Sequence, residues 1–222
     1  MVPISDSRTT SNSEQLFLNI AAYATRTMVL GPGTRAAVWV QGCPINCPGC
    51  IAPEWIPNIS ALQISPEELV EKIEIESVDG LTFSGGEPMQ QAEGLALLAR
   101  LARKIKPVSL ICFTGYRYER LVSQPPNPGV HDLLGEIDVL IDGPYIEAKN
   151  DSVGLRGSSN QRIIHLTKKL QHHEFELQSR SLELSIRDGE ISLIGIPTKN
   201  LKSALDQARF ELSERQEPYE RL

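Results

Sequence analysis

The sequence lacks a long apolar run and an excess of basic residues. No stretch approaches the ~20 consecutive apolar residues of a membrane-spanning helix, and the polar beginning MVPISDSRTTSNSEQ lacks the apolar segment of a signal peptide. Lysine and arginine number 22 against 28 aspartates and glutamates, which gives a formal net charge of −6. Nucleic acid and anionic membranes are bound by basic faces, so we expect neither as a partner. The expected location is the cytoplasm.

Cysteine is also scarce, with four in 222 residues, yet three of them crowd into GCPINCPGC as Cys43, Cys47 and Cys50. In a reducing compartment, grouped thiols are more typical of metal binding or redox chemistry than of disulfides. Structural zinc usually has four protein ligands, and a ferredoxin cluster takes four cysteines, whereas Cys112 stands alone in the apolar stretch SLICF. Three thiolates on one loop predict a metal centre with one position open to a small molecule. Structural zinc remains the alternative.

Apolar stretches alternate with helical patterns through the first three quarters of the chain. Ser65, Pro66 and Glu68 form a helix start that predicts a helix over 66–77, and a second helical pattern covers 89–104. The segments with the composition of strands are LFLNIAAYA, AAVWVQG, GLTFSGGEP, VSLICFTG and IDVLIDGPY. This order predicts an α/β fold with a parallel sheet. Because a full eight-unit barrel needs ~250 residues, we expect a partial, open β/α barrel.

The chain divides into three expected parts: a flexible tail over 1–15, a partial-barrel domain over 16–166, and a C-terminal extension over 167–222. Within the extension, LELSIRDGEISLIGI alternates around Asp188-Gly189, which predicts a β-hairpin. The segment NLKSALDQARFELSERQ predicts an amphipathic final helix.

The cysteine spacing, followed by a strand that ends in SGGEP, resembles the radical S-adenosylmethionine (SAM) enzymes. With CFTGY, DVLIDGPYIE and LRGSSNQRII added in the same order, the chain resembles the small glycyl-radical enzyme activases, especially those that serve anaerobic ribonucleotide reductase. The resemblance runs from about Val38 to Leu166 and implies two cofactors. Cys43, Cys47 and Cys50 would hold a [4Fe-4S] cluster, and the cluster's unique iron would chelate SAM.

The resemblance and the strand positions nominate seven cofactor-binding residues: Gly49, Ser84, Gly85, Gly86, Glu87, Thr114 and Asp142. The glycines of SGGEP allow close backbone approach, and the carboxylate of Glu87 would offset the ammonium group of SAM. Gly49 stands where many radical SAM proteins have an aromatic residue near the adenine. Thr114 and Asp142 fall at the carboxyl ends of strands, where barrel-like folds place their ligands.

The implied activity is reductive cleavage of SAM to methionine and a 5′-deoxyadenosyl radical, which removes hydrogen from a glycine Cα of a partner enzyme. Flavodoxin or ferredoxin would donate the electron. The step requires no protein acid or base, so no catalytic residue is nominated. The extension leaves a second enzyme open, a maturase of a ribosomally made precursor peptide that works with a leader-binding partner. A third reading is a non-catalytic iron–sulfur or zinc binding module, against which the intact SGGEP speaks.

Overall fold

The computed structural model describes residues 16–187 and 190–214; the expected tail over 1–15 and the turn Asp188-Gly189 lie outside the described residues. The strands are β1 (Leu18–Thr27), β2 (Arg35–Val40), β3 (Leu62–Ile64), β4 (Gly80–Gly85), β5 (Ser109–Thr114), β6 (Val139–Asp142), β7 (Arg162–His165), β8 (Leu182–Arg187) and β9 (Glu190–Gly195). The helices are α1 (Pro66–Lys72), α2 (Ala92–Ile105), α3 (Tyr118–Ser123), α4 (Val130–Glu136) and α5 (Lys199–Glu214).

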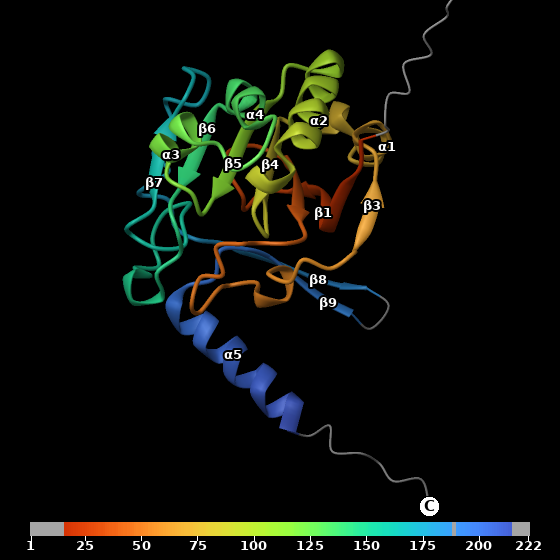
Figure 1. The fold of residues 1–222 in the computed structure, drawn as a ribbon. Coiled ribbons are helices and arrows are strands. Elements are labelled where there is room, and N and C mark those ends of the chain that lie inside the picture. Colours follow the sequence, from red (N-terminus) through yellow and green to blue (C-terminus); the bar gives the residue numbers. More distant parts are fainter. Residues whose placement is uncertain (1–15, 188–189, 215–222) are drawn as a thin grey trace, which may run out of the picture.

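Seven strands form one sheet in the order β3-β1-β2-β4-β5-β6-β7 (Figure 1). The four central strands, β2, β4, β5 and β6, run parallel to one another. The outer strands β1, β3 and β7 pair antiparallel to their neighbours. The sheet therefore has a parallel centre and two free edges, and the prediction of an open α/β architecture is confirmed. The predicted hairpin and final helix are present as β8, β9 and α5.

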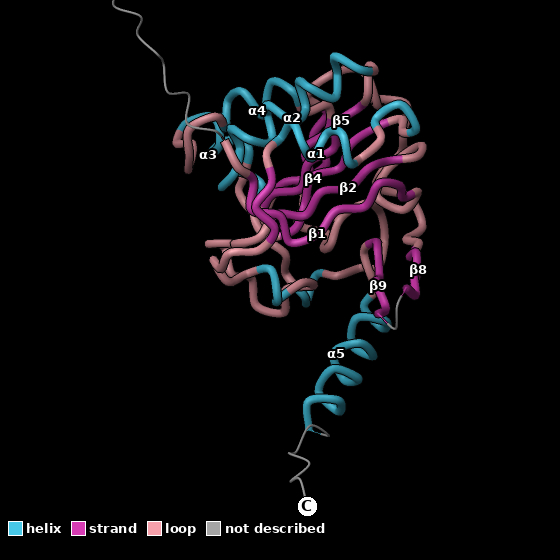
Figure 2. The backbone as a smooth tube through the Cα atoms, turned by 90° about the vertical axis from the view of Figure 1, so that its right-hand side faces the viewer, coloured by secondary structure: helices cyan, strands magenta, loops and turns pink. Residues whose placement is uncertain are grey.

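Helices cover one face of this sheet (Figure 2). All six residues of β2 are buried, as expected for a central strand that packs on both faces. On α2, Leu95, Leu98 and Ala102 are fully buried at helical spacing and join the core under the sheet. Among the described residues, no helix is long and apolar enough to cross a membrane.

The opposite face is covered by segments that follow β6, including the extension. Leu170, Phe175 and Ile196 of the extension are buried in one cluster with Trp39 of β2 and Ile111 of β5. Figure 2 shows β8, β9 and α5 on this side of the sheet, away from α1–α4. The boundary at 166/167 stays a prediction, and the buried residues Leu170, Phe175 and Ile196 show that part of the extension packs on the sheet.

One local prediction was wrong, and two strands were missed. The helix expected over 66–77 ends at Lys72, because Glu74 takes a left-handed conformation (φ 47°) and a 3₁₀ turn follows. No strand was predicted between the cysteines and Ser65, yet Leu62–Ile64 form β3 by pairing with β1. The strand β7 was not predicted at all. The two missed strands depend on distant partners, because β3 pairs with β1 and β7 pairs with β6.

An arginine lies buried at the amino-terminal ends of the central strands. Arg35 is fully buried, and its guanidinium donates to Thr82 Oγ1 (2.7 Å) and Ser109 Oγ (3.0 Å). Burial lowers the pKa of Arg35 to about 10, so the side chain stays charged at neutral pH. Arg35 thus provides hydrogen-bond partners for buried polar groups of β4 and β5 at the amino-terminal ends of the strands. This end of the sheet, opposite the cysteine loop, therefore has a structural role.

The start of α1 offers a test of the sequence-based helix signal. Ser65 accepts from the Glu68 N–H (3.2 Å) and the Glu68 carboxylate accepts from the Ser65 N–H (3.2 Å), which completes a capping box. We expect Ser65→Ala to lower the free energy of unfolding by about 1 kcal/mol, because the Glu68 N–H loses its partner. Urea denaturation of the metal-free protein measures this. Ser123→Ala, which removes a hydroxyl near the end of α3, should change stability by less than ~0.5 kcal/mol.

Candidate functional site

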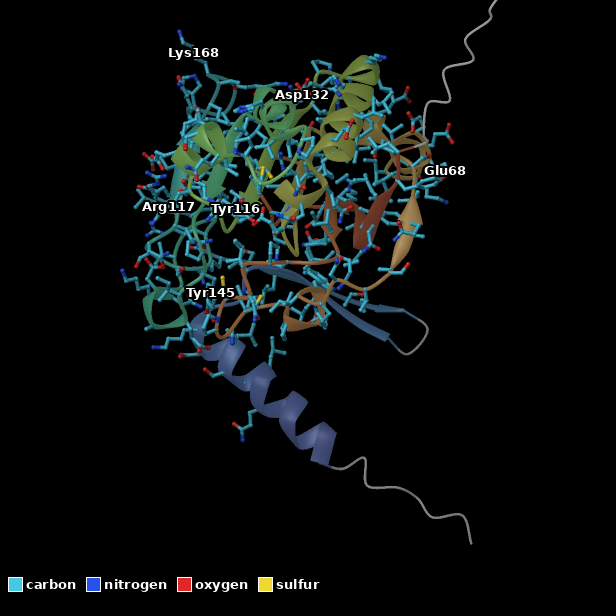
Figure 3. The ribbon with its side chains drawn as sticks, in the orientation of Figure 1. Glu68, Tyr116, Arg117, Asp132, Tyr145 and Lys168 are labelled. Atoms are coloured by element: carbon cyan, nitrogen blue, oxygen red, sulfur yellow. The ribbon has the colours of Figure 1, made fainter. Side chains whose placement is uncertain are left out.

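The carboxyl ends of the four parallel strands meet at one edge of the sheet, and a distinctive turn follows each of them. The cysteine loop, residues 42–50, follows β2, and the turn Gly86-Glu87 follows β4. Gly115-Tyr116 follows β5, and the segment 143–147 follows β6. Parallel α/β sheets bind their ligands at this edge. Figure 3 labels Tyr116 and Tyr145 on the turns after β5 and β6.

The cysteine loop is closed at its base by a returning arm of the chain. The Gly42 N–H donates to the Trp55 carbonyl (2.9 Å), and the Cys43 N–H donates to the Ile56 carbonyl (2.9 Å). Trp55 in turn packs against Trp39 of β2, with ring centroids 6.0 Å apart. These contacts fix where the loop leaves the sheet, so its three thiols have a defined starting geometry. Trp55 serves as a packing residue here.

The three thiols lie half-buried within one another's electrostatic influence. Burial raises the pKa of each, and the charge of Cys50 raises the pKa of Cys43 further. For Cys47 the main cause of the raised pKa is again burial. A hydrogen bond from the backbone of Tyr145 acts in the opposite direction and lowers the pKa of this thiol. Among the residues the structure describes, no group of three or more His, Cys, Asp and Glu side chains is close enough together to hold a single metal ion.

The thiols fit a [4Fe-4S] cluster on their donor chemistry. Iron–sulfur clusters are bound by cysteine thiolates, and each of the three cysteines offers a thiol that is half-buried rather than sealed in the core. Cys112, by contrast, is fully buried within β5, where burial raises its pKa well above the usual value. The structure brings Cys43, Cys47 and Cys50 together on one loop and leaves Cys112 in the strand.

The two glycines of SGGEP attach the end of β4 to the cysteine loop. Gly85 has φ 103°, a conformation that favours glycine, and a Cβ on Gly86 would lie 2.2 Å from the Gly42 carbonyl oxygen. The Gly86 N–H donates to the Val40 carbonyl (2.7 Å), and the Glu87 N–H donates to the Gly42 carbonyl (2.9 Å). In this structure the two glycines therefore allow the end of β4 to pack closely against the backbone at the start of the cysteine loop. Their contact with SAM stays a prediction.

Glu87 connects the ends of β4 and β5 from a buried position. Its side chain is 1% exposed. Oε1 accepts from Thr114 Oγ1 (2.8 Å) and the Met89 N–H (3.0 Å), and Oε2 accepts from the Gly115 N–H (2.8 Å). Burial raises its pKa to about 7 against the opposing effect of these hydrogen bonds. A carboxylate has about four acceptor positions, so Oε2 retains one for a further donor.

Two further residues nominated from the sequence, Ser84 and Asp142, lie at the carboxyl ends of β4 and β6. Ser84 lies in the half-buried last part of β4, opposite Trp39 in the parallel register. Asp142 is fully buried and accepts from the Tyr118 N–H (2.8 Å) and from Arg162 Nε (2.9 Å). The carboxylate of Asp142 is thus committed to holding neighbouring turns, and its contact with SAM stays a prediction.

Sequence reasoning missed several residues that shape the site. A Cβ on Gly115 would lie 2.9 Å from Ile45, so this side chain of the cysteine loop reaches over the turn after β5. Gly49 has φ 70°, and its missing Cβ would lie 2.7 Å from Glu147 Oε2. The motif DVLIDGPYIE contains Tyr145 and Glu147, but the sequence did not show that Glu147 lies beside the cysteine loop.

Comparisons with known proteins agree on one relationship. The family of 4Fe-4S single cluster domains matches residues 29–164. The anaerobic ribonucleoside-triphosphate reductase-activating protein of Salmonella typhi is 32% identical over 150 residues, covering 63% of this chain and 93% of that protein. Its counterpart in Escherichia coli (strain K12) is 28% identical over 158 residues, covering 67% and 99%.

Enterobacteria phage T4 has an activating protein of the same name that is 28% identical over 152 residues, covering 66% of this chain and 93% of that protein. The crystal structure of QueE from Escherichia coli aligns with 47% of this chain and 57% of that chain, at 19% identity and a TM-score of 0.38.

The open α/β sheet and the matched 4Fe-4S single cluster domain define the class, an iron–sulfur protein. The chain belongs to the radical SAM, activase-like family of these single-cluster proteins. The matched region ends at residue 164, so the whole C-terminal extension, 167–222, lies outside it.

Proposed function

We propose that this protein is a radical SAM enzyme of the activase type, which removes a hydrogen atom from a glycine Cα of a glycyl-radical enzyme. When bound, the [4Fe-4S] cluster and SAM supply a 5′-deoxyadenosyl radical as the hydrogen acceptor. The proposal rests on the following arrangement. The three thiols share the loop after β2, and the charge of Glu87 acts on two of them, Cys43 and Cys47, at the edge where parallel sheets bind ligands.

In this proposal Cys43, Cys47 and Cys50 hold the cluster, because they are the thiols that share a loop and a half-buried setting. Cluster binding requires thiolates, so it must overcome the raised pKa values of these groups by the positive charge of the irons. The base of the loop is fixed by the hydrogen bonds from Gly42 and Cys43. This limits the freedom that the loop loses when the cluster binds.

Glu87 then faces the methionine end of SAM with its free acceptor position. Thr114 and the Gly115 N–H hold the carboxylate in place, so an approaching ammonium meets an oriented partner. Gly49, Ser84, Gly85, Gly86 and Asp142 complete the proposed cofactor-binding set. No side chain is assigned a proton transfer, since hydrogen-atom removal requires none.

The proposed partners follow from the same reading. The substrate is a polypeptide, as the name of the related activating proteins suggests. A flavodoxin or ferredoxin would supply the electron, and the cytoplasm is the compartment in which the thiols stay reduced.

One observation favours a second candidate, the maturase of a ribosomally made precursor peptide. The family match ends at residue 164, and the extension beyond it contributes Leu170, Phe175 and Ile196 to the buried cluster on the sheet face opposite the helices. A segment absent from the matched region is where a different polypeptide substrate, or a leader-binding partner, would be accommodated.

Hydrogen transfer tests the proposal and separates the candidates. The cluster-loaded enzyme is mixed anaerobically with unlabelled SAM, a strong reductant, and an anaerobic ribonucleotide reductase deuterated at glycine Cα. We expect 5′-deoxyadenosine one mass unit heavier than in the sample with undeuterated polypeptide. The measurement is mass spectrometry of the nucleoside.

The other outcomes are equally informative. Deuterium acquired only from another labelled position of a precursor peptide supports the maturase. Efficient transfer from a small metabolite, with none from either polypeptide, would overturn the proposal of a polypeptide substrate. A protein that holds iron but neither binds nor cleaves SAM would be the non-catalytic module.

A further inference from the structure

The C-terminal extension sends one lysine towards the cysteine loop. Lys202 lies in the first turn of α5, and its residue is only 6% exposed. Its Nζ forms an ion pair with Glu147 Oε1 at 3.0 Å, across 55 positions of sequence. A lysine that is almost completely buried requires a reason, because burial of its charge costs free energy unless it is paired.

Glu147 connects Lys202 to the cysteine loop. While Oε1 binds Lys202, Oε2 lies where a Cβ of Gly49 would come within 2.7 Å of it. Gly49 stands between Cys47 and Cys50. The carboxylate therefore fills the space beside Gly49, and the ion pair holds it there.

The start of α5 is itself fixed, so the position of Lys202 is not accidental. The Lys199 N–H donates to Ser152 Oγ (2.9 Å). Arg180 Nη1 donates to the Pro197 carbonyl (2.9 Å) and to Asn150 Oδ1 (2.8 Å), which ties the segment before α5 to the residues that follow Glu147. Figure 1 shows α5 starting beside this part of the chain.

The charge of Lys202 also lies close to the cysteine loop. Its ion-pair partner Glu147 fills the space beside Gly49, the residue before Cys50. Because the environment is partly buried, such a charge is weakly screened. Any negative charge that builds up at the loop would be stabilised by it.

We propose that Lys202 is a positioning residue of the cluster site, contributed by the extension: through Glu147 it holds the Gly49 part of the cysteine loop and adds a positive charge beside the cluster. This rests on the proposed function, since it takes Cys43, Cys47 and Cys50 as the cluster ligands. The charge favours the reduced cluster, which carries one more negative charge than the oxidised one.

The test is a redox titration of the cluster in full-length variants. Lys202→Met should lower the ratio of reduced to oxidised cluster at a fixed potential about tenfold, equal to about 59 mV for a one-electron couple. Glu147→Gln should shift the potential the other way, because it removes a negative charge and leaves the lysine. Lys202→Arg should stay near wild type. Lys199→Met, which removes an exposed charge from the same helix, is the matched control.

A second readout follows the loop without the cluster. Backbone hydrogen exchange of the segment 47–50 in metal-free protein should speed up in both Lys202→Met and Glu147→Gln. If Lys202→Met fails to retain iron, recovery of iron in Lys202→Arg supports the proposal. Unchanged potentials and unchanged exchange in variants with a full cluster would overturn it. Wild-type protein that holds no cluster would instead contradict the proposed function.

Discussion

Cys47→Ala is expected to abolish both the cluster and the release of 5′-deoxyadenosine. The cluster of the wild-type protein would have three thiolate ligands and one open position, so loss of the central ligand leaves two. Cys47 also receives a hydrogen bond from the backbone of Tyr145, which links it to the turn after β6. Iron and sulfide analysis with visible absorption, on anaerobically reconstituted protein, should give about four of each for wild type and far less for the variant.

Cys112→Ala is the matched control for this prediction. Cys112 is a buried residue of β5 and belongs to the core under the helices, so its loss should leave the iron content unchanged. Two results contradict the assignment: an intact cluster in Cys47→Ala, or stoichiometric zinc without iron in wild-type protein purified anaerobically. Loss of iron in Cys112→Ala would show that the three loop cysteines are not sufficient.

Glu87→Ala is expected to weaken SAM binding to the cluster-loaded protein about ten- to a hundredfold. One charge-assisted hydrogen bond contributes roughly 1.5–3 kcal/mol, and the free acceptor position of Oε2 is where the ammonium would bind. Anaerobic calorimetry measures both affinities. Glu93→Ala, which removes an exposed carboxylate at the start of α2, should bind SAM like wild type.

Glu87→Gln and pH separate binding from folding. The glutamine keeps the shape of the side chain that connects Thr114 to Gly115, and its melting temperature reports whether the connection survives. Burial raises the pKa of Glu87 to about 7, so the carboxylate is mostly protonated at pH 6 and mostly charged at pH 8. SAM affinity of wild type should therefore be about tenfold lower at pH 6 than at pH 8, and that difference should vanish in Glu87→Gln. Equal affinities in wild type and both variants would show that Glu87 does not bind the ammonium.

The sequence by itself determined the features that depend on neighbours along the chain. Ser65 and Glu68 are three residues apart, so the capping box was visible before the helix. The spacing of Cys43, Cys47 and Cys50 placed three thiols on one loop, and SGGEP marked the end of a strand. The alternation around Asp188-Gly189 predicted β8 and β9. Short-range geometry fixes all of these.

Only the tertiary structure decided what these features contact. Oε1 of Glu87 accepts from Thr114, 27 positions away, and Lys202 reaches Glu147 across 55 positions. A local pattern of residue types does not show such contacts, because they form when strands and helices far apart in sequence pack at one edge of the sheet. For the same reason β3 was missed, since it is a strand only through its pairing with β1. The residues proposed to bind the cofactors could be identified from the sequence, whereas the residues that hold them in place could be identified only from the fold.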